Sequence, residues 1–272
     1  MPFLEQKDVR IYYEDHGEGV PIVLTYGLAG NTRMWQPQIE DFSRRYRLVL
    51  WDQRGHGQSD SPVDSESYGV WKSVEDLHAL IEVLGIEEAF IGGQSMGGGV
   101  ATRFALRYPD ETKALLVFNS HNASGLNSKP SKREMRKRSI EIVQNEGMEA
   151  MAEFSMQADA NTMSHLECSP DSLDVARERI RQMFLASDPI GYVNSIVAAR
   201  NSDDISGQLR GIQIPTLLVV GDKDPALDSM RFIRRKITHA VFEVLSNAGH
   251  HANLDNPRDF NATVLRFLDS QI

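Results

Sequence analysis

The stretch "AFIGGQSMGGGVATRFALRYP", residues 89–109, places one serine, Ser95, between pairs of small residues. The part before it, 89–93, is a short apolar run that suits a strand buried on both faces. The part after it, 97–109, is predicted to be a helix. Gly93 to Gly97 fits the pattern G-x-S-x-G, and a strand–turn–helix junction is the context in which that pattern positions a nucleophile. The bare pattern also fits a turn that happens to contain serine, but the junction favours a strained turn that exposes the Ser95 hydroxyl.

Further apolar runs on both sides of this junction predict more strands. "VRIYYEDHG" (9–17) alternates and is predicted to be an edge strand. Nearly continuous apolar runs predict buried strands, and these are "PIVLTYG" (21–27), "RLVLWDQRG" (47–55), "ALLVFNS" (114–120), "PTLLVVGD" (215–222) and "AVFEVLS" (240–246). Helical patterns lie between many of them, such as Val74, Leu77, Ile81 and Leu84 before Gly85. Strands that alternate with helices predict an α/β fold with a doubly wound, mostly parallel sheet and right-handed crossovers.

The segment 121–207 departs from this alternation because it contains no strand-like run. Its clearest patterns are helical: "SKREMRKRSIEIVQNEG" (131–147), "SLDVARERIRQMFLAS" (172–187) and "DPIGYVNSIVAARNS" (188–202). We expect residues 121–207 to form a helical lid over the carboxyl ends of the strands, where open α/β sheets bind ligands. The core domain would then consist of residues 1–120 and 208–272.

Composition excludes several classes of function. The chain has 272 residues and a net charge of −9, which argues against a nucleic-acid partner. We find neither a signal peptide nor a stretch long enough to span a membrane, so a cytoplasmic protein is expected. Cys168 is the one cysteine, and His165 beside it lacks metal-ligand spacing, so we predict no disulfide, metal or cofactor. The oligomeric state is left open.

A serine hydroxyl needs a general base, and the base needs a carboxylate that orients it. "GDKDPALD" (221–228) follows one predicted strand and offers Asp222, Asp224 and Asp228. "GHHANLDNP" (249–257) follows the last strand and offers His250 and His251. We favour Asp224 as the acid and His250 as the base, and the alternative is that these residues only cap turns. Three roles, each at the end of a buried strand and in the expected chain order, argue against that alternative for all three.

With these motifs the chain resembles the α/β-hydrolase superfamily over essentially its whole length. "DQRGHGQSDSP" (52–62) is similar to the Asp-x-Arg-Gly-x-Gly-x-Ser turn of that superfamily, "GDKDP" to its acid turn and "GHHANLDNP" to its terminal Gly-His segment. The resemblance implies an eight-stranded sheet, places the acid on Asp224 and the base on His250, and makes Asp255 structural. One departure is Tyr26 before Gly27, where these enzymes usually have His-Gly at the oxyanion loop.

By position, the backbone N–H groups of Leu28 and Met96 are expected to form the oxyanion hole. The N–H of Met96 would lie at a helix N-terminus, where the helix dipole favours the negative charge of an oxyanion. Residues considered for substrate contact, each with plain packing or loop support as the alternative, are Tyr26, Trp35, His121 and Asn122. Arg54 and His56 are expected to fix loops by hydrogen bonds.

The lid carries two further signals about the substrate. Six of the ten methionines fall in it and predict a mainly apolar chamber, and these are Met135, Met148, Met151, Met156, Met163 and Met183. The basic run "SKREMRKR" (131–138) is either a solvated helix face or a patch that steers acidic substrates.

The predicted function is a serine hydrolase that cleaves an ester or lactone of a small, partly apolar carboxylic acid. The stretch 34–62 is most similar to the 3-oxoadipate enol-lactonase branch, which favours a small-molecule substrate of this kind. Alternatives are a hydrolase of carbon–carbon bonds in a vinylogous diketone and a hydrolase-like ligand receptor. A structural protein with an inactive triad fits less well, because all three positions are filled.

Overall fold

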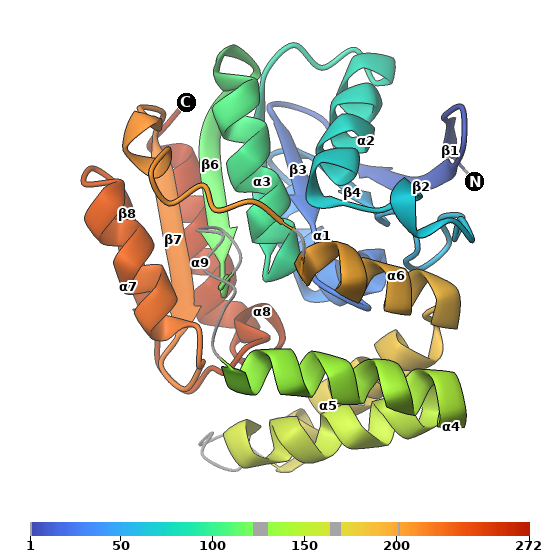
Figure 1. Ribbon diagram of the computed structural model, residues 1–272. Coiled ribbons are helices and arrows are strands. Elements are labelled where there is room, and N and C mark those ends of the chain that lie inside the picture. The colour runs from blue at the N-terminus through green and yellow to red at the C-terminus, as the bar shows by residue number, and fades with distance from the viewer. Residues whose placement is uncertain (1, 122–129, 164–169, 201) are drawn as a thin grey trace.

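A single eight-stranded sheet forms the centre of the molecule, with strand order β1-β2-β4-β3-β5-β6-β7-β8 (Figure 1). The computed structural model describes residues 2–121, 130–163, 170–200 and 202–272. The strands are β1 (Phe3–Glu5), β2 (Arg10–His16), β3 (Pro21–Thr25), β4 (Arg47–Trp51), β5 (Ala89–Gln94), β6 (Thr112–Phe118), β7 (Thr216–Gly221) and β8 (Val241–Leu245). β1, β2 and β4 pair antiparallel, and every pair from β4 through β3 to β8 is parallel.

The sheet edge at β1 differs from the sequence prediction. The run 9–17 forms β2, but β2 is not the outermost strand, because β1 pairs with its first half through Leu4 and Ile11. A strand of three residues is too short to show a periodicity, so the sequence gives no sign of β1.

Helices cover both faces of the sheet. α1 (Gln36–Ser43) and α9 (Pro257–Asp269) pack on one face, where Phe42 and Phe260 are buried. α2 (Val70–Val83), α3 (Met96–Arg107) and α7 (Leu227–Lys236) pack on the other, where Val74 and Val100 are buried. A short helix, α8 (Ala252–Asp255), precedes α9. Asn256 caps α9, because its side-chain oxygen accepts a hydrogen bond from the Asp259 N–H. The predicted doubly wound architecture is therefore the observed one.

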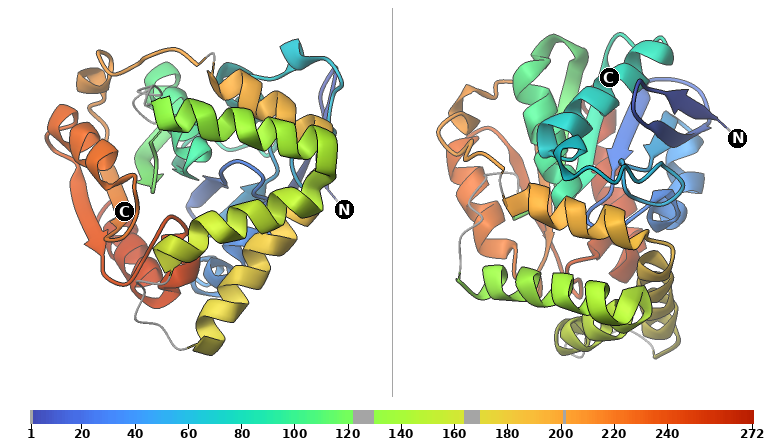
Figure 2. Two further views of the ribbon diagram at one scale, coloured as in Figure 1. Left: turned by 60° about the horizontal axis from the view of Figure 1, so that its bottom comes forward. Right: turned by 45° about the vertical axis from the view of Figure 1, so that its right-hand side comes forward.

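The helical segment between β6 and β7 consists, in the described part of the chain, of α4 (Pro130–Met163), α5 (Pro170–Leu185) and α6 (Pro189–Arg200). α4 bends at Gly147, whose φ of 84° is left-handed, and packs against α5 and α6. Figures 1 and 2 show α4 and α5 lying across the end of the sheet toward which β6 points. None of the helices in the described ranges is long and apolar enough to cross a membrane.

Candidate active site

Ser95 lies at the turn between β5 and α3, and its backbone conformation is strained. Its φ is 52° and its ψ is −114°, a conformation that L-residues rarely adopt. The turn closes because Gly93 and Gly97 approach so tightly that a Cβ on Gly93 would lie 2.2 Å from the Gly97 carbonyl carbon. The Ser95 N–H donates to the Phe118 carbonyl of the neighbouring β6 at 2.9 Å. These contacts hold the hydroxyl at the carboxyl end of a fully buried strand.

The structure brings Ser95, His250 and Asp224 together in one hydrogen-bonded line. His250 Nε2 lies 3.0 Å from Ser95 Oγ, and His250 Nδ1 lies 3.1 Å from each oxygen of Asp224. The loops after β5, β7 and β8 supply them, and the carboxyl ends of parallel strands share one edge of a sheet. The rival candidates lie elsewhere, because Asp222 accepts from the Ala248 N–H at 3.2 Å and Asp228 pairs with Arg231.

The Asp224 carboxylate is buried but well supplied with hydrogen bonds. Oδ1 accepts from the Ala226 N–H at 2.8 Å and Oδ2 accepts from Asn119 Nδ2 at 2.7 Å. Burial alone would raise the pKa of Asp224, but the charge and hydrogen bond of His250, with these two donors, lower that pKa to about 2. The carboxylate is therefore ionised throughout the neutral range and fixes Nδ1 of His250 as a donor.

Two side chains that sequence reasoning missed support this arrangement. Asn119, at a φ of 47°, also donates from Nδ2 to the Gly249 carbonyl at 2.9 Å, which links the acid to the loop that carries His250. Gln94 donates from Nε2 to the His250 carbonyl at 2.8 Å. Asp255 accepts from the Gly249 N–H at 2.7 Å, as the structural role assigned to it requires. A polar residue at the end of a buried strand was the available signal for both Asn119 and Gln94.

Leu28 and Met96 flank Ser95 in a cavity of about 150 Å³. Met96 is the first residue of α3, so its N–H has no acceptor within the helix. The positive end of the helix dipole favours negative charge at this point. The loop that follows β3 brings Leu28 to the same cavity. Both residues thus line the same cavity as Ser95, and an oxyanion hole made by their backbone N–H groups stays a prediction.

A larger chamber of about 410 Å³ opens above Ser95 and is mainly apolar. Met135, Met151 and Met183 line it, together with Phe154, Phe184, Tyr192 and Ile196. Met148 is instead buried in the core of the helical segment. His121 also lines the chamber, and its Nδ1 lies 3.2 Å from Ser229 Oγ. Arg136 of α4 is the one arginine or lysine among the described lining residues.

The other residues considered for substrate contact are placed differently. Tyr26 and Trp35 are buried, and neither is among the described residues that line the chamber. Their rings pack against each other at 5.1 Å, and Trp35 also meets Phe118. Substrate contact by these two side chains stays a prediction, and the ring packing is the alternative that was considered for both. Asn122 falls outside the described residues.

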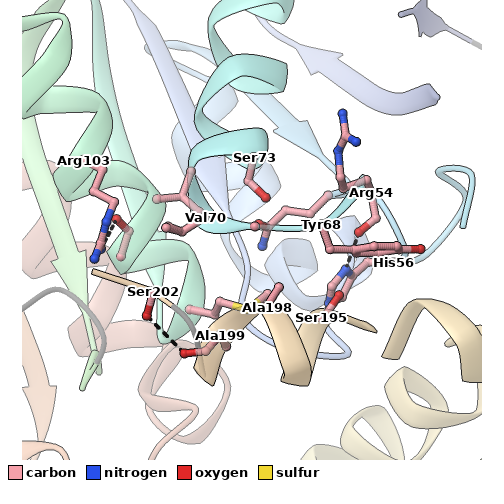
Figure 3. A pocket seen from close by; sticks show the side chains of 15 residues that line it. Arg54, His56, Tyr68, Val70, Ser73, Arg103, Ser195, Ala198, Ala199 and Ser202 are labelled. Carbon is pink, nitrogen blue, oxygen red and sulfur yellow. Dashed lines mark hydrogen bonds between the residues drawn. The ribbon is translucent and has the colours of Figure 1, made fainter. Parts of the chain in front are cut away.

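Another, smaller cavity of about 30 Å³ lies between α3, α6 and the loop after β4 (Figure 3). Arg54 donates to both oxygens of Asp76 at 2.7 Å, and His56 Nδ1 lies 3.0 Å from the Arg54 carbonyl. These bonds fix the loop, as expected for both residues. His56 Nε2 has no partner among the described residues, and the cavity has room for about one water molecule.

No cluster of histidine, cysteine, aspartate or glutamate that could hold a metal ion is found within the described part of the chain.

Comparison with known proteins identifies a matching family and several similar proteins. A family model described as alpha/beta hydrolase fold matches residues 20–257. The chain is 28% identical over 265 residues to 3-oxoadipate enol-lactonase 2 of Acinetobacter baylyi, covering 96% of this chain and 94% of that protein. Among solved structures, the enol-lactonase from Burkholderia xenovorans is 27% identical with a TM-score of 0.85, covering 98% and 100% of the two chains. A thermophilic esterase from Thermogutta terrifontis is 27% identical with a TM-score of 0.84, covering 97% and 94%.

Proposed function

The chain belongs to the alpha/beta hydrolase family, and we propose that it is a serine hydrolase that cleaves an ester or lactone of a small, partly apolar carboxylic acid. The observation that carries the proposal is the hydrogen-bonded line of Ser95, His250 and Asp224, with 3.0 Å between Ser95 Oγ and His250 Nε2. A serine in this contact can lose its proton to the imidazole as it attacks a carbonyl carbon.

In the acylation step, Ser95 Oγ attacks the ester carbonyl while His250 Nε2 takes the hydroxyl proton. The carbonyl oxygen becomes an oxyanion, which the N–H groups of Leu28 and Met96 stabilise. Asp224 stabilises the imidazolium that forms, because its carboxylate is ionised and accepts from Nδ1. His250 then protonates the leaving alcohol, and the C–O bond breaks to give an acyl-enzyme.

In the deacylation step, His250 takes a proton from water, and the resulting hydroxide attacks the acyl carbon. A second oxyanion forms in the same place, and its collapse returns the proton from His250 to Ser95 Oγ. A lactone follows the same course, except that its alcohol stays attached to the acyl chain.

The substrate class is supported by the chamber and by the relatives. A chamber of about 410 Å³ with methionine and aromatic walls suits a small apolar acyl or alcohol group. The names of the relatives include enol-lactonase and esterase, and we propose the same pair of reactions for this chain. We also propose that residues 121–207 act as a lid, since α4, α5 and α6 supply much of the chamber wall.

The test is covalent labelling with a fluorophosphonate probe, followed by mass spectrometry of the labelled peptide. We expect the label on Ser95, and we expect Ser95→Ala to lose both the label and at least about a thousandfold of ester turnover. Ser120→Ala is a matched control, because its hydroxyl donates to the Ser95 carbonyl and is not in the proton line. Labelling at another serine, or wild-type turnover by Ser95→Ala, would exclude the proposal.

A substrate panel then separates the alternatives. Multiple turnovers of esters and lactones support the proposed function. Preferential turnover of a vinylogous diketone would favour the carbon–carbon hydrolase. A single slow turnover with a stable adduct would favour a ligand receptor.

A further inference from the structure

Two cavities meet at one methionine of α5. The chamber above Ser95 has a volume of about 410 Å³, and an outer pocket of about 350 Å³ lies between α5 and residues 31–36, which include the 3₁₀ helix η1 (Thr32–Trp35). Met183 is the one residue, among those described, that lines both cavities. It is 3% exposed, so its side chain lies within the wall that separates them.

The outer pocket opens to solvent on the side away from the chamber. Met34 and Met183 line it and are buried. Four other residues that line it are exposed, and these are Arg33, Gln36, Glu178 and Gln182. The pocket therefore has a polar rim and two methionines at its floor, and the floor at Met183 is also a wall of the chamber.

Hydrogen bonds fasten α5 to the segment that it faces. Ser187 Oγ, just beyond the end of α5, lies 3.1 Å from the Ala29 carbonyl oxygen and 3.0 Å from the Met183 carbonyl oxygen. Arg179 Nη2 donates to Gln36 Oε1 at 2.9 Å. These contacts hold α5 to the loop after β3 and to the start of α1, on both sides of Met183 along the helix.

The opposite side of the outer pocket is held by a buried carboxamide. Asn253 Nδ2 donates to the Met34 carbonyl at 2.8 Å and to Gln38 Oε1 at 3.1 Å. Asn253 is itself buried. Because the backbone is held on both sides of the wall, shortening the Met183 side chain should open the wall rather than let α5 move inward.

We propose that Met183 is a specificity-determining residue, which limits the length of the substrate by closing the chamber toward the outer pocket. The inference rests on the proposed function and deepens it by naming the substrate class: esters or lactones whose chains end within the chamber. A longer chain has to displace the Met183 side chain or fold back inside the chamber, and both options oppose its binding.

The wall is tested without any substrate, by crystal structures of two variants. In Met183→Ala we expect the chamber to become continuous with the outer pocket. Met151→Ala is the paired control, because Met151 is also a buried methionine of the chamber and is not among the described residues that line the outer pocket. We expect this control to enlarge the chamber and leave the wall complete. A complete wall in Met183→Ala would contradict the proposal.

The effect on specificity is tested with two pairs of esters that differ in chain length. p-Nitrophenyl butyrate and p-nitrophenyl decanoate differ on the acyl side, and ethyl butyrate and octyl butyrate differ on the alcohol side. We expect wild-type kcat/KM to favour the short member of at least one pair. In Met183→Ala the long-to-short ratio of that pair should rise about tenfold, which is what burial of roughly two further methylene groups supplies. In Met151→Ala it should change less than about threefold.

Filling the outer pocket distinguishes this route from a general loosening of the helical segment. Gln182 lines the outer pocket and is exposed. In Met183→Ala/Gln182→Trp the indole takes up space that a long chain would enter, so we expect the ratio to return toward the wild-type value. Gln182→Trp alone should keep the wild-type ratio, because Met183 already closes the chamber. A ratio that stays raised in the double variant would show that the gain does not come from the outer pocket, against the proposal.

Two kinetic outcomes would overturn the proposal: no preference for the short ester in either wild-type pair, or the same ratios in Met183→Ala as in the wild-type protein. Failure of the serine hydrolase function is distinguishable from both. It would abolish the labelling of Ser95 and the turnover of short and long esters alike, whereas the crystal structures of the two variants would still report on the wall.

Discussion

At the scale of single residues, the candidate site depends on the fixed donors and acceptors around His250. Asp224 receives hydrogen bonds from Asn119 and from the Ala226 N–H, so its two oxygens are held in place before they meet His250 Nδ1. The His250 carbonyl is in turn held by Gln94. The imidazole is therefore positioned from both its backbone and its Nδ1 edge, with Nε2 directed at Ser95.

Asp224→Asn tests this positioning directly. The carboxamide cannot stabilise an imidazolium, and it favours the wrong tautomer of His250, so we expect kcat to fall by about a thousandfold to ten-thousandfold. Steady-state kinetics with a p-nitrophenyl ester measures the change, and a thermal melt checks the fold. Asp222→Asn is the control and should change kcat less than about threefold. Equal losses in the two variants would contradict the assignment of the acid.

A second residue-scale prediction concerns the effect of pH on stability. The pKa of His251 is about 3 in the folded protein, mainly through burial, and the unfolded residue takes up a proton near pH 6.5. Because the unfolded state binds more protons between these values, the free energy of unfolding falls as pH drops from about 6.5, by up to about 1.4 kcal/mol per pH unit. Urea unfolding between about pH 6.5 and pH 4.5 measures the slope.

In His251→Phe, the unfolded state takes up about one proton fewer on acidification. We therefore expect the dependence of the free energy of unfolding on pH to be shallower by up to about 1.4 kcal/mol per pH unit. His56, whose pKa is also lowered by burial, contributes equally to both proteins and cancels. The carboxylate of Asp224 titrates below this window in the folded state. Identical slopes would show that His251 is not neutral in the folded protein at these pH values.

Sequence motifs were sufficient to predict the nucleophile, the acid and the base as candidates, since each follows a buried strand in a recognisable turn. They were not sufficient for Asn119, Gln94 or Asn253, because their roles arise from contacts between segments far apart in the chain. Gln38 and Asn253, for example, are separated by 215 residues and meet only in the folded protein. For the same reason, Tyr26 was considered for substrate contact, although its hydroxyl turns to Asn253 and His251.

At the scale of secondary structure, α4 carries the basic run of the helical segment on more than one face. Arg136 lines the chamber, whereas Arg138 is exposed and pairs with Glu141. Only the first of these arginines is placed to contact a substrate. The sequence shows the run of basic residues but not which of them faces the chamber. That depends on the bend of α4 at Gly147 and on how α4 packs against α5 and α6, and neither can be derived from the periodicity of α4 alone.

Replacing single arginines of α4 distinguishes a substrate contact from a solvated face. For p-nitrophenyl hemisuccinate, which is anionic, relative to neutral p-nitrophenyl pentanoate, we expect Arg136→Met to lower the ratio of kcat/KM about tenfold, mainly through KM. Arg138→Met removes the same charge from the same helix and should keep the ratio. A similar fall in both variants would indicate long-range steering by the whole run.

At the scale of the whole molecule, the helical segment must be fastened to the sheet domain for the chamber to keep its shape. Arg103 of α3 is 1% exposed, lies 2.9 Å from the Asp203 carboxylate and donates to the Asp203 carbonyl at 2.6 Å. Asp203 follows α6, which lines the chamber through Tyr192 and Ile196. The Arg103–Asp203 ion pair therefore connects α3, which begins after Ser95, with the residues that follow α6, a helix that lines the chamber.

Removing only Asp203 from this ion pair should lower the free energy of unfolding more than expected from the double variant, in which both partners are replaced. Asp203→Ala leaves the guanidinium of Arg103 buried with backbone carbonyls as its acceptors, and we expect a loss of about 2 kcal/mol in the free energy of unfolding. In Arg103→Met/Asp203→Ala the buried charge is gone, so the loss should be smaller than the sum of the two single losses. Urea unfolding of the four proteins in this cycle measures the coupling, and KM for a bulky ester reports whether α6 has shifted. Strictly additive losses, with KM unchanged in every variant, would mean that the helical segment is held to the sheet by its apolar contacts alone.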